Sequence, residues 1–374
     1  METMKMQTQN TKHGFTLLEL MVSMALGLIV MASMASLFKT GMDSTFLVAQ
    51  RAETQQNMRA AIDLMVKDIN QAGAGIPSGG IQLPAGGGTS VAKYACDQTG
   101  TCYVPAHTYP TGNYMYGIIP GFNNGVQGAA VVPSAPGQVN DSITVIYADY
   151  NFPLWEYNVT FPVGPDGTLI NLTPNAAFVP APPLPNAAGG IQVGDLILIN
   201  GTNGNTAVGE ATAVTANSIS FANLDPLNIN WSNAAGRTNN VYATSGGAGF
   251  AFPPPANTTQ GTAYRLFAVT YYLTVPVNGQ LPRLMRQVNG LTPVPVADNI
   301  INLQFAFDIY NSTTNALDAN QANPLGVAES PNLIQKINVV VMGESMTQNG
   351  NKSQNMYLAT SVSARNMAFR NKYQ

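Results

Sequence analysis

The chain has 374 residues, with 16 basic and 19 acidic residues giving a net charge of −3, and is 45% hydrophobic but only 9% charged. Its length accommodates two or three domains, and its apolar fraction is sufficient for a packed core. The charged fraction lies far below the roughly 25% of a typical soluble domain. Uncharged polar residues take its place, which suits a β-rich extracytoplasmic domain and argues against nucleic acid as a partner.

The first predicted element is an apolar run from residue 15 to 38, within GFTLLELMVSMALGLIVMASMASLF. At the helical rise this run is about 36 Å long, enough to cross a bilayer core of roughly 30 Å. The mildly basic segment before it, with Lys5 and Lys12, favours a cytoplasmic N-terminus. A secretory signal peptide would have a shorter apolar region, followed by a small-residue cleavage site. The run therefore predicts a single transmembrane helix.

A helical pattern continues beyond the apolar run. One mostly apolar face recurs at steps of three and four residues: Leu47, Arg51, Thr54, Met58, Ile62, Met65 and Ile69. The segment GAGIPSGG, residues 73–80, then predicts the end of the helix. We expect one helix over residues 15–72, with its transmembrane part at 15–38. Within that part, Ser23 with Gly27 and Ala32 with Ser36 would permit close helix packing, or simply face lipid.

The N-terminal residues resemble a known family. GFTLLELMVSMALGLIV is similar to the class III signal of type IV prepilins, in which a short basic leader ends in Gly and is followed by Phe-Thr-Leu-Leu-Glu-Leu. The resemblance implies that residues 1–14 form a leader peptide. It implies cleavage by a prepilin peptidase between Gly14 and Phe15, and methylation of the new amine on Phe15.

Glu19 is a carboxylate inside the apolar run. At the centre of a bilayer such a group costs about 2.5–3.5 kcal/mol, and less near the interface. The prepilin resemblance implies that Glu19 docks on the amine of a neighbouring subunit and so acts as a register device in a fibre. The alternative is that Glu19 pairs with its own N-terminus and is merely tolerated in the anchor.

The only two cysteines are Cys96 and Cys102, in ACDQTGTCY. One pair in a Gly-rich loop predicts a small disulfide formed in an oxidising compartment. Metal binding is the weaker alternative, because two thiolates make half a zinc site and no other ligand cluster completes it.

Beyond residue 76 the chain is rich in strand and turn signals. Residues 71–263 hold two basic and eight acidic residues, unlike either flank, which suggests an insertion. We therefore predict a β-rich insert at 77–260 and a C-terminal pilin-like β-sheet region at 261–374. The predicted strands are residues 141–149, 193–201, 213–221, 263–275, 281–287, 299–310, 333–343 and 355–366, with a turn at 288–291. The predicted class is α+β, with the long N-terminal helix packed on an antiparallel sheet.

Nothing in the sequence predicts catalysis. Only His13 and His107 could serve a His-dependent triad, and His13 lies in the predicted leader. Five aspartates are scattered at predicted turns, where solvated turn caps are favoured over a Ca²⁺ site. They are Asp141, Asp149, Asp166, Asp195 and Asp225. We expect no enzyme activity, no metal and no cofactor.

A looser resemblance covers about residues 260–370, where LPRLMRQVNGLTPVPVADNIINLQFAFDIY and YLATSVSARNMAFRN are similar to PilW-type minor pilins. It implies a minor pilin that primes or caps a type IV pilus, with its globular part in the periplasm and later near the pilus tip. The implied partners are other minor and major pilins, the prepilin peptidase and the inner-membrane assembly platform. The alternatives are a pseudopilin of a type II secretion system, or a tip adhesin acting through residues 77–260.

Overall fold

The computed structural model describes residues 14–83, 91–110, 114–125, 139–160, 168–178, 180, 190–201, 206–222, 225–230, 261–274, 282–324, 330–345 and 354–367. Most of the predicted leader, together with His13 and Asp166, lies outside these residues. Two compact units divide the chain, residues 1–53 and residues 54–374.

One helix, α1, runs from Leu17 to Gln71 and confirms the prediction of a single long N-terminal helix. The chain leaves it through Gly73 and Gly75, whose φ angles of 77° and 73° lie in the left-handed region that favours glycine. No described residue of the first unit is buried. In the second unit the same helix buries Met58, Met65 and other residues.

The remaining elements are mostly strands. Before residue 230 these are β1 (Ile81–Gln82), β2 (Tyr114–Met115), β3 (Ile118–Gly121), β4 (Ser142–Asp149), β5 (Tyr157–Thr160), β6 (Leu169–Pro174), β7 (Leu196–Gly201), β8 (Thr206–Glu210), β9 (Ala213–Val214) and β10 (Ser218–Ser220). After residue 260 they are β11 (Gly261–Thr274), β12 (Arg283–Val288), β13 (Val294–Asp298), β14 (Ile300–Asn311), β15 (Ala316–Gln321), β16 (Ile334–Ser345) and β17 (Gln354–Ser363). In the described part of the chain, the short 3₁₀ helices η1 (Leu154–Glu156) and η3 (Pro331–Leu333) lie among these strands.

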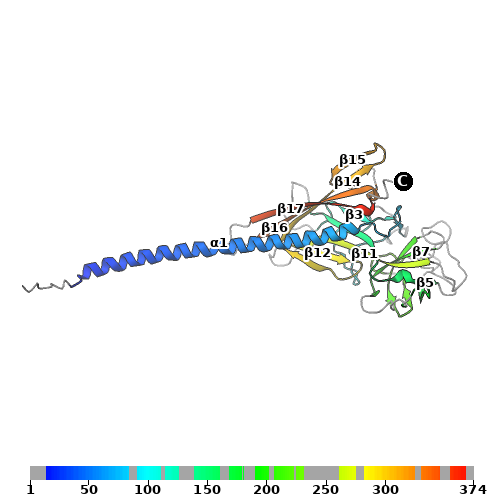
Figure 1. The fold of residues 1–374 in the computed structure, drawn as a ribbon, viewed down its shortest axis with the longest axis horizontal. Helices are drawn as coiled ribbons and strands as arrows, with labels where there is room; N and C mark the ends of the chain where they lie inside the picture. The colour runs from blue at the N-terminus through cyan, green and yellow to red at the C-terminus, as the bar shows by residue number, and fades with distance from the viewer. Residues whose placement is uncertain are drawn as a thin grey trace, which may run out of the picture. The chain divides into compact units, whose positions relative to one another are not determined.

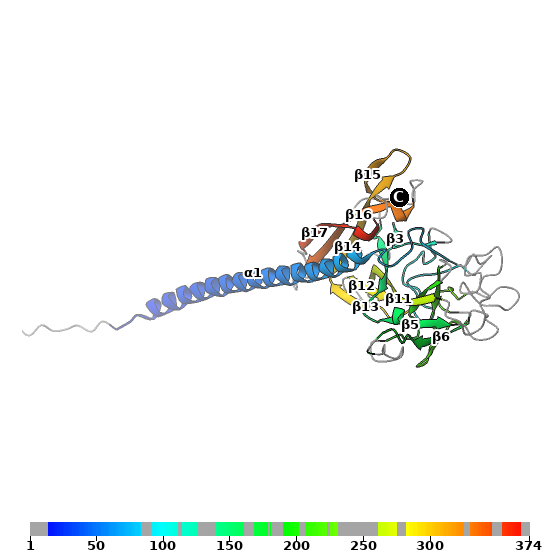
Figure 2. The same ribbon diagram turned by 45° about the vertical axis from the view of Figure 1, so that its right-hand side comes forward.

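An 11-stranded sheet is organised around the long strand β11 (Figure 2). This strand pairs antiparallel with β4, β7 and β12 along different parts of its 14 residues, and touches β5 at Gly261. The strands β4, β5 and β7 lie before residue 230 in the chain. The sheet is therefore made by pairing across the predicted boundary at residue 260.

A second, four-stranded sheet has the order β15-β14-β16-β17, and all its pairs are antiparallel (Figure 1). The pairing of β16 with β17 continues without interruption from Lys336–Ser363 to Ser345–Gln354. A separate two-stranded sheet joins β1 and β2.

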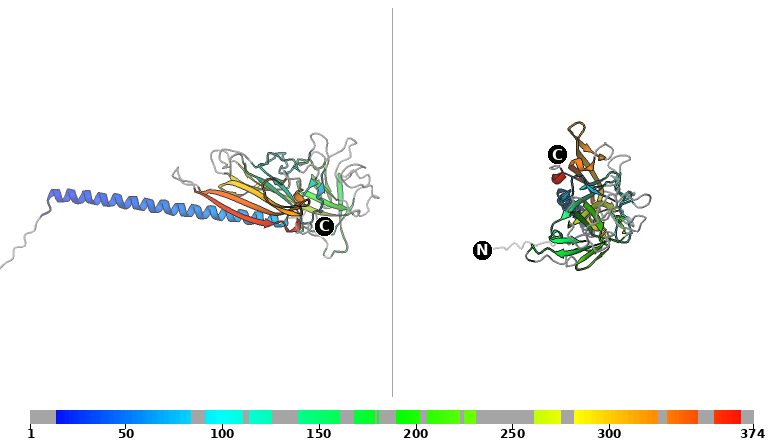
Figure 3. Two further views of the ribbon diagram at one scale, coloured as in Figure 1. Left: turned by 90° about the horizontal axis from the view of Figure 1, so that it is seen from above. Right: turned by 90° about the vertical axis from the view of Figure 1, so that its right-hand side faces the viewer.

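Within the second unit, α1 and both larger sheets share one hydrophobic core. The helix contributes Met58, Met65 and Ile69, which pack in one cluster with Val341 and Phe305 of the smaller sheet and with Val145, Tyr271 and Leu273 of the larger one. Full burial of each such aliphatic side chain contributes about 1.5–3 kcal/mol. Figure 3 shows β17 alongside this part of α1, and hydrogen bonding of the Asn366 amide to the Asn70 carbonyl oxygen (3.3 Å) agrees with that placement.

The structure confirms the predicted α+β class and alters some of its details. Residues 213–221 form the two short strands β9 and β10, which pair with each other, in place of one strand. The turn at 288–291 follows β12 as predicted, with Asn289 at a φ of 49°. The C-terminal strands divide between two sheets, β11–β13 in the larger and β14–β17 in the smaller. The domain limits of 77–260 and 261–374 stay predictions.

Candidate functional site

The first turn of α1 is closed by Thr16 and Glu19. The Thr16 backbone N–H and hydroxyl donate to Glu19 Oε2 at 3.2 and 3.1 Å, and the Glu19 N–H donates to Thr16 Oγ1 at 3.3 Å. This reciprocal arrangement is a capping box, which satisfies backbone donors that the helix start leaves open. It supplies Glu19 with hydrogen bonds but with no positive charge.

The residues around this turn make few contacts of their own. The Phe15 side chain is 87% exposed, and the large apolar side chains from Leu17 to Phe38 are all more than half exposed. A Cβ atom added at Gly14 would meet nothing within 4 Å. The fold itself therefore gives no steric reason for glycine at position 14. By length and composition, α1 can cross a membrane, and no residue of its most apolar 18-residue window is buried.

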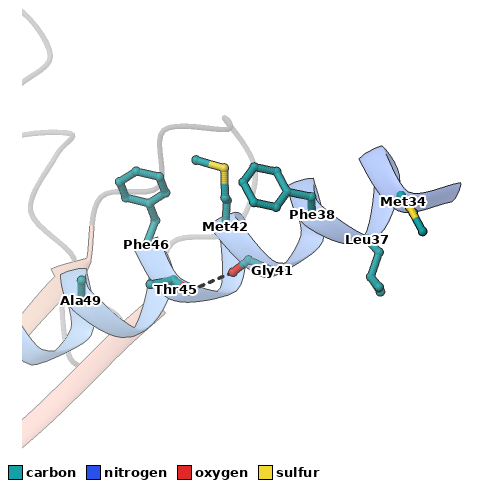
Figure 4. Close-up of a pocket in the computed structure, with 8 residues that line it drawn as sticks. All are labelled: Met34, Leu37, Phe38, Gly41, Met42, Thr45, Phe46 and Ala49. Carbon is teal, nitrogen blue, oxygen red and sulfur yellow. Dashed lines mark hydrogen bonds between the residues drawn. The ribbon is translucent and has the colours of Figure 1, made fainter. Parts of the chain in front are cut away.

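An open groove with apolar walls lies along the helix from Met34 to Ala49, across the end of the predicted transmembrane part (Figure 4). In Figure 4 the side chains of Phe38, Met42 and Phe46 point to one side of the helix, and the Thr45 hydroxyl donates to the Gly41 carbonyl oxygen at 2.9 Å. The lining residues are Met34, Leu37, Phe38, Gly41, Met42, Thr45, Phe46 and Ala49.

The second half of α1 carries a different carboxylate, Asp68, which is only 2% exposed. Tyr271 and Tyr147 donate their hydroxyl hydrogen bonds to Asp68 Oδ2 and Oδ1 at 2.6 and 3.0 Å. Arg286 donates from Nε to Asp68 Oδ2 at 2.9 Å and completes an ion pair. These partners come from β11, β4 and β12, so Asp68 ties the helix to three strands of the larger sheet.

Electrostatics in this cluster follow from burial and from the Asp68 charge. Burial raises the pKa of Tyr271 and of Tyr147, and the neighbouring carboxylate raises both pKa values further. Burial acts to lower the pKa of Arg286, but its hydrogen bond to Asp68 and the attraction of that charge outweigh burial and raise the pKa. Arg286 therefore stays charged. The sequence pattern had shown only an apolar helix face and gave no signal for this ion pair.

The structure joins Cys96 and Cys102 in a disulfide, as the sequence predicts. Inside the loop, Asp97 Oδ1 accepts hydrogen bonds from the N–H groups of Thr99 and Thr101 at 2.9 and 3.1 Å. The Tyr103 hydroxyl donates to Asp97 Oδ2 at 2.5 Å. Gln98 donates to Glu210 Oε1 and so connects the loop to β8.

Four of the aspartates that the sequence suggested as solvated turn caps are buried, which corrects that interpretation. Exposure is 2% at Asp141, Asp149 and Asp195, and 3% at Asp225. Asp141 accepts from the N–H groups of Asn123 and Phe305 at 2.8 and 2.9 Å, and burial raises its pKa to about 6. Asp149 accepts from Arg265 in a buried ion pair. Asp141 and Asp149 therefore accept hydrogen bonds from backbone N–H and guanidinium groups in place of water.

Glu210 and Asp225 form a buried pair of acids beside the disulfide loop. Asp225 accepts from the N–H groups of Ile229 and Asn230 at 2.9 and 2.7 Å. Burial, followed by the hydrogen bond and charge of Asp225, raises the pKa of Glu210 to about 9. Glu210 is therefore protonated at neutral pH. No group of three or more His, Cys, Asp or Glu side chains suited to a metal ion occurs among the residues that the structure describes.

Comparison with known proteins gives one match. Residues 9–35 match the family described as the prokaryotic N-terminal methylation motif. No curated protein and no solved structure matches the chain. The matched segment spans the Gly14–Phe15 bond, the capping box and most of the exposed apolar helix.

This match and the helix together support a type IV prepilin-like protein, of a pilus or of a pseudopilus. The motif implies processing by a prepilin peptidase and partnership with other pilins. A single N-terminal apolar helix fits single-pass anchoring in the inner membrane. Proteins with this motif are structural components and not enzymes.

Proposed function

We propose that the chain is a minor pilin that primes assembly of a type IV pilus or caps it. The observation that carries the proposal is the methylation motif leading directly into α1, whose first half has no buried residue and whose second half is held by its own globular unit. A unit of residues 54–374 on every subunit would crowd a fibre, whereas one copy at the tip has room. The looser PilW-type resemblance supports the same role.

The proposed processing cleaves the bond between Gly14 and Phe15 and methylates the Phe15 amine. Open space around Gly14 supports this. The fold does not require glycine at this position, whereas a peptidase whose site fits only a small residue does require it. Glu19 then lies four residues after the new N-terminus. The chain before residue 15 stays in the cytoplasm, and the globular unit lies in the periplasm before it enters the pilus.

Glu19 is proposed to dock on the amine of a neighbouring subunit. Thr16 gives Glu19 two hydrogen bonds but leaves its charge without a positive partner. In a water-poor fibre core an unpaired carboxylate costs several kcal/mol, so one stagger between subunits is favoured over the others. Pairing with the amine of its own chain remains the competing arrangement.

The test compares the amount of chain in the membrane with the amount in sheared fibres. We expect Glu19→Ala to insert and to be cleaved, yet to be lost from fibres. Gly14→Val is the matched processing control, because a branched side chain should block cleavage and keep residues 1–14 attached. Wild-type fibre incorporation of Glu19→Ala would contradict the docking role.

The same samples separate the pilus from the pseudopilus. If the wild-type chain is absent from sheared pili and its deletion abolishes protein secretion instead, the chain is a type II secretion pseudopilin, which shares the N-terminal chemistry. Presence in pili, with fewer pili after deletion, supports the minor pilin.

A further inference from the structure

The edge strand β17 differs from every other strand that ends a sheet in the described part of the chain. It has ten residues, QNMYLATSVS, with no charge, proline or glycine. The other terminal strands have at most six residues. Long, uncharged edges are pairing sites, and proteins usually protect them with short length, charge, proline or bulges.

The other edges show those protections. β13 contains Pro295, ends at Asp298 and has a register shift in its pairing with β12. β15 contains Asp318 and pairs with β14 across another shift. β3 contains Pro120, and β9 has only two residues. β17 lacks each of these features, and its register with β16 has no shift.

The register also fixes which backbone groups of β17 point away from β16. The Ala364 N–H donates to the Gln335 carbonyl oxygen at 2.9 Å. Because hydrogen-bonded pairs alternate along an antiparallel ladder, the even-numbered residues of β17 face β16. The Glu344 N–H agrees, since it donates to Asn299 and points away from its partner Asn355. The outward N–H and C=O groups therefore belong to Asn355, Tyr357, Ala359, Ser361 and Ser363.

The direction of β17 restricts what can pair with it. A Cβ atom at Gly343 would lie 2.9 Å from Met58 and from Thr54, so the start of β17, which pairs with Ser345, lies near the beginning of the helix in this unit. The end of β17 leads to Asn366, which contacts Asn70. β17 thus runs in the same direction as this part of α1.

A second copy of the chain is a poor occupant. Antiparallel pairing of β17 with β17 would set the two helices in opposite directions, whereas subunits anchored in one membrane share a direction. Pairing of β17 with β15 of another copy would keep the direction but would repeat from copy to copy, which does not suit a subunit proposed to occur once at a tip. β15 also carries Asp318 and is interrupted in register.

We propose that β17 is a docking edge that takes an uncharged β-strand, paired antiparallel, from a different subunit of the same assembly. Antiparallel pairing is slightly more stable per residue than parallel pairing. The exposed face of β17, formed by Asn355, Tyr357, Ala359 and Ser361, is uncharged and suits such a strand. Backbone hydrogen bonds give affinity in this mode, and alternate side chains give specificity. The proposal rests on the minor-pilin function and names its kind of partner.

The first test removes one outward hydrogen-bond donor from the full-length chain in its native cells. Ala359→Pro deletes an outward N–H but no ladder bond to β16, a substitution that edge strands tolerate. Ala359→Thr is the matched control, because it changes the side chain at the same position and keeps the N–H. We expect the fibre-to-membrane ratio to fall about tenfold for the proline variant only, as for a loss of about 1.4 kcal/mol. Wild-type incorporation of Ala359→Pro would overturn the proposal.

The second test does not depend on how the proline variant folds. A photo-reactive phenylalanine analogue is placed at position 357 and, separately, at 361 in an otherwise wild-type chain, and crosslinked peptides are identified by mass spectrometry. Antiparallel pairing predicts that the crosslinked position on the partner moves back by four residues between the two probes. Crosslinks to the same partner residue from both probes, to another copy of this chain, or to no protein would each overturn the proposal. Crosslinks are scored in membranes as well as fibres, so absence of the chain from pili defeats the minor-pilin function without deciding the docking edge.

Discussion

Two carboxylates, Glu19 in the first half of α1 and Asp68 in the second, differ in burial and in the partners they have within the chain. Glu19 lies in an exposed segment, where it caps the first turn through Thr16. Asp68 is 2% exposed and meets an arginine and two tyrosines of its own chain. The charge of Asp68 is therefore balanced by an arginine of the same chain, whereas Glu19 has no positively charged partner among the described residues. A single helix can serve two assemblies, its own globular unit and a fibre, when its charges are distributed in this way.

The largest expected effect on the free energy of unfolding comes from removing Asp68, the acid whose partners lie within the chain. Asp68→Ala leaves Arg286 charged, half-buried and without its carboxylate, so we expect the free energy of unfolding to fall by about 3–5 kcal/mol. Denaturant unfolding of the full chain in detergent measures it. Asp63→Ala is the matched control, because Asp63 is an exposed aspartate of the same helix. Equal losses for the two variants would contradict the central place of Asp68.

Removal of the disulfide should cost less. Replacing both Cys96 and Cys102 by Ser opens a seven-residue ring, for which loop entropy suggests about 2 kcal/mol. The change should leave the Asp68 cluster intact, because that cluster and the loop are built from different residues. Unfolding midpoints with and without reductant measure the effect, and the double variant should not respond to reductant. A loss as large as that of Asp68→Ala would contradict the ranking.

A smaller effect per pH unit is expected from Glu210, a buried acid that has another acid, Asp225, as its neighbour. Its folded pKa of about 9 is above the unfolded value, so the folded state retains a proton that the unfolded state loses. The contribution of Glu210 to the free energy of unfolding is complete below about pH 4. It is lost as pH rises toward 9, by at most about 1.4 kcal/mol per pH unit. Unfolding measured from pH 5 to 9 should show a shallower decline in Glu210→Gln than in wild type. Parallel curves would contradict the shift.

The smallest expected effect on folding is that of Glu19→Ala. The globular unit begins after this residue, so its free energy of unfolding should change by less than about 0.5 kcal/mol. The lost capping box should loosen the helix start by about 1 kcal/mol, which hydrogen exchange of the first turn reports. Destabilisation of the globular unit would show that the halves are not independent.

Sequence patterns predicted the helix and most strands well, because those features are local. The end of α1 followed from its glycines, and Met58, Ile62, Met65 and Ile69 were found by their spacing. The burial of Asp68 was not predicted, because a charged residue in a helix is usually solvated and its partners lie 79 to 218 positions away. The pairing of β11 with β4 and β7 across residue 260 is equally long-range. At the N-terminus, the roles of Gly14, Phe15 and Glu19 are predictions from the motif.

The contacts that hold the second half of α1 are spread along the helix, and this spread bears on how the globular unit responds to force. A pull on the chain at Thr54 along the helix axis loads the contacts of Met58, Met65 and Asp68 side by side, as shear, because they are spread along that axis. Contacts loaded in shear must yield together, whereas contacts peeled at right angles yield one after another. The Asp68 ion pair and Ile69 lie toward the far end of the segment, so they are reached late if the helix is peeled from Thr54. The packing of the second half of α1 on the sheets would therefore resist a pull along the helix through several contacts at once.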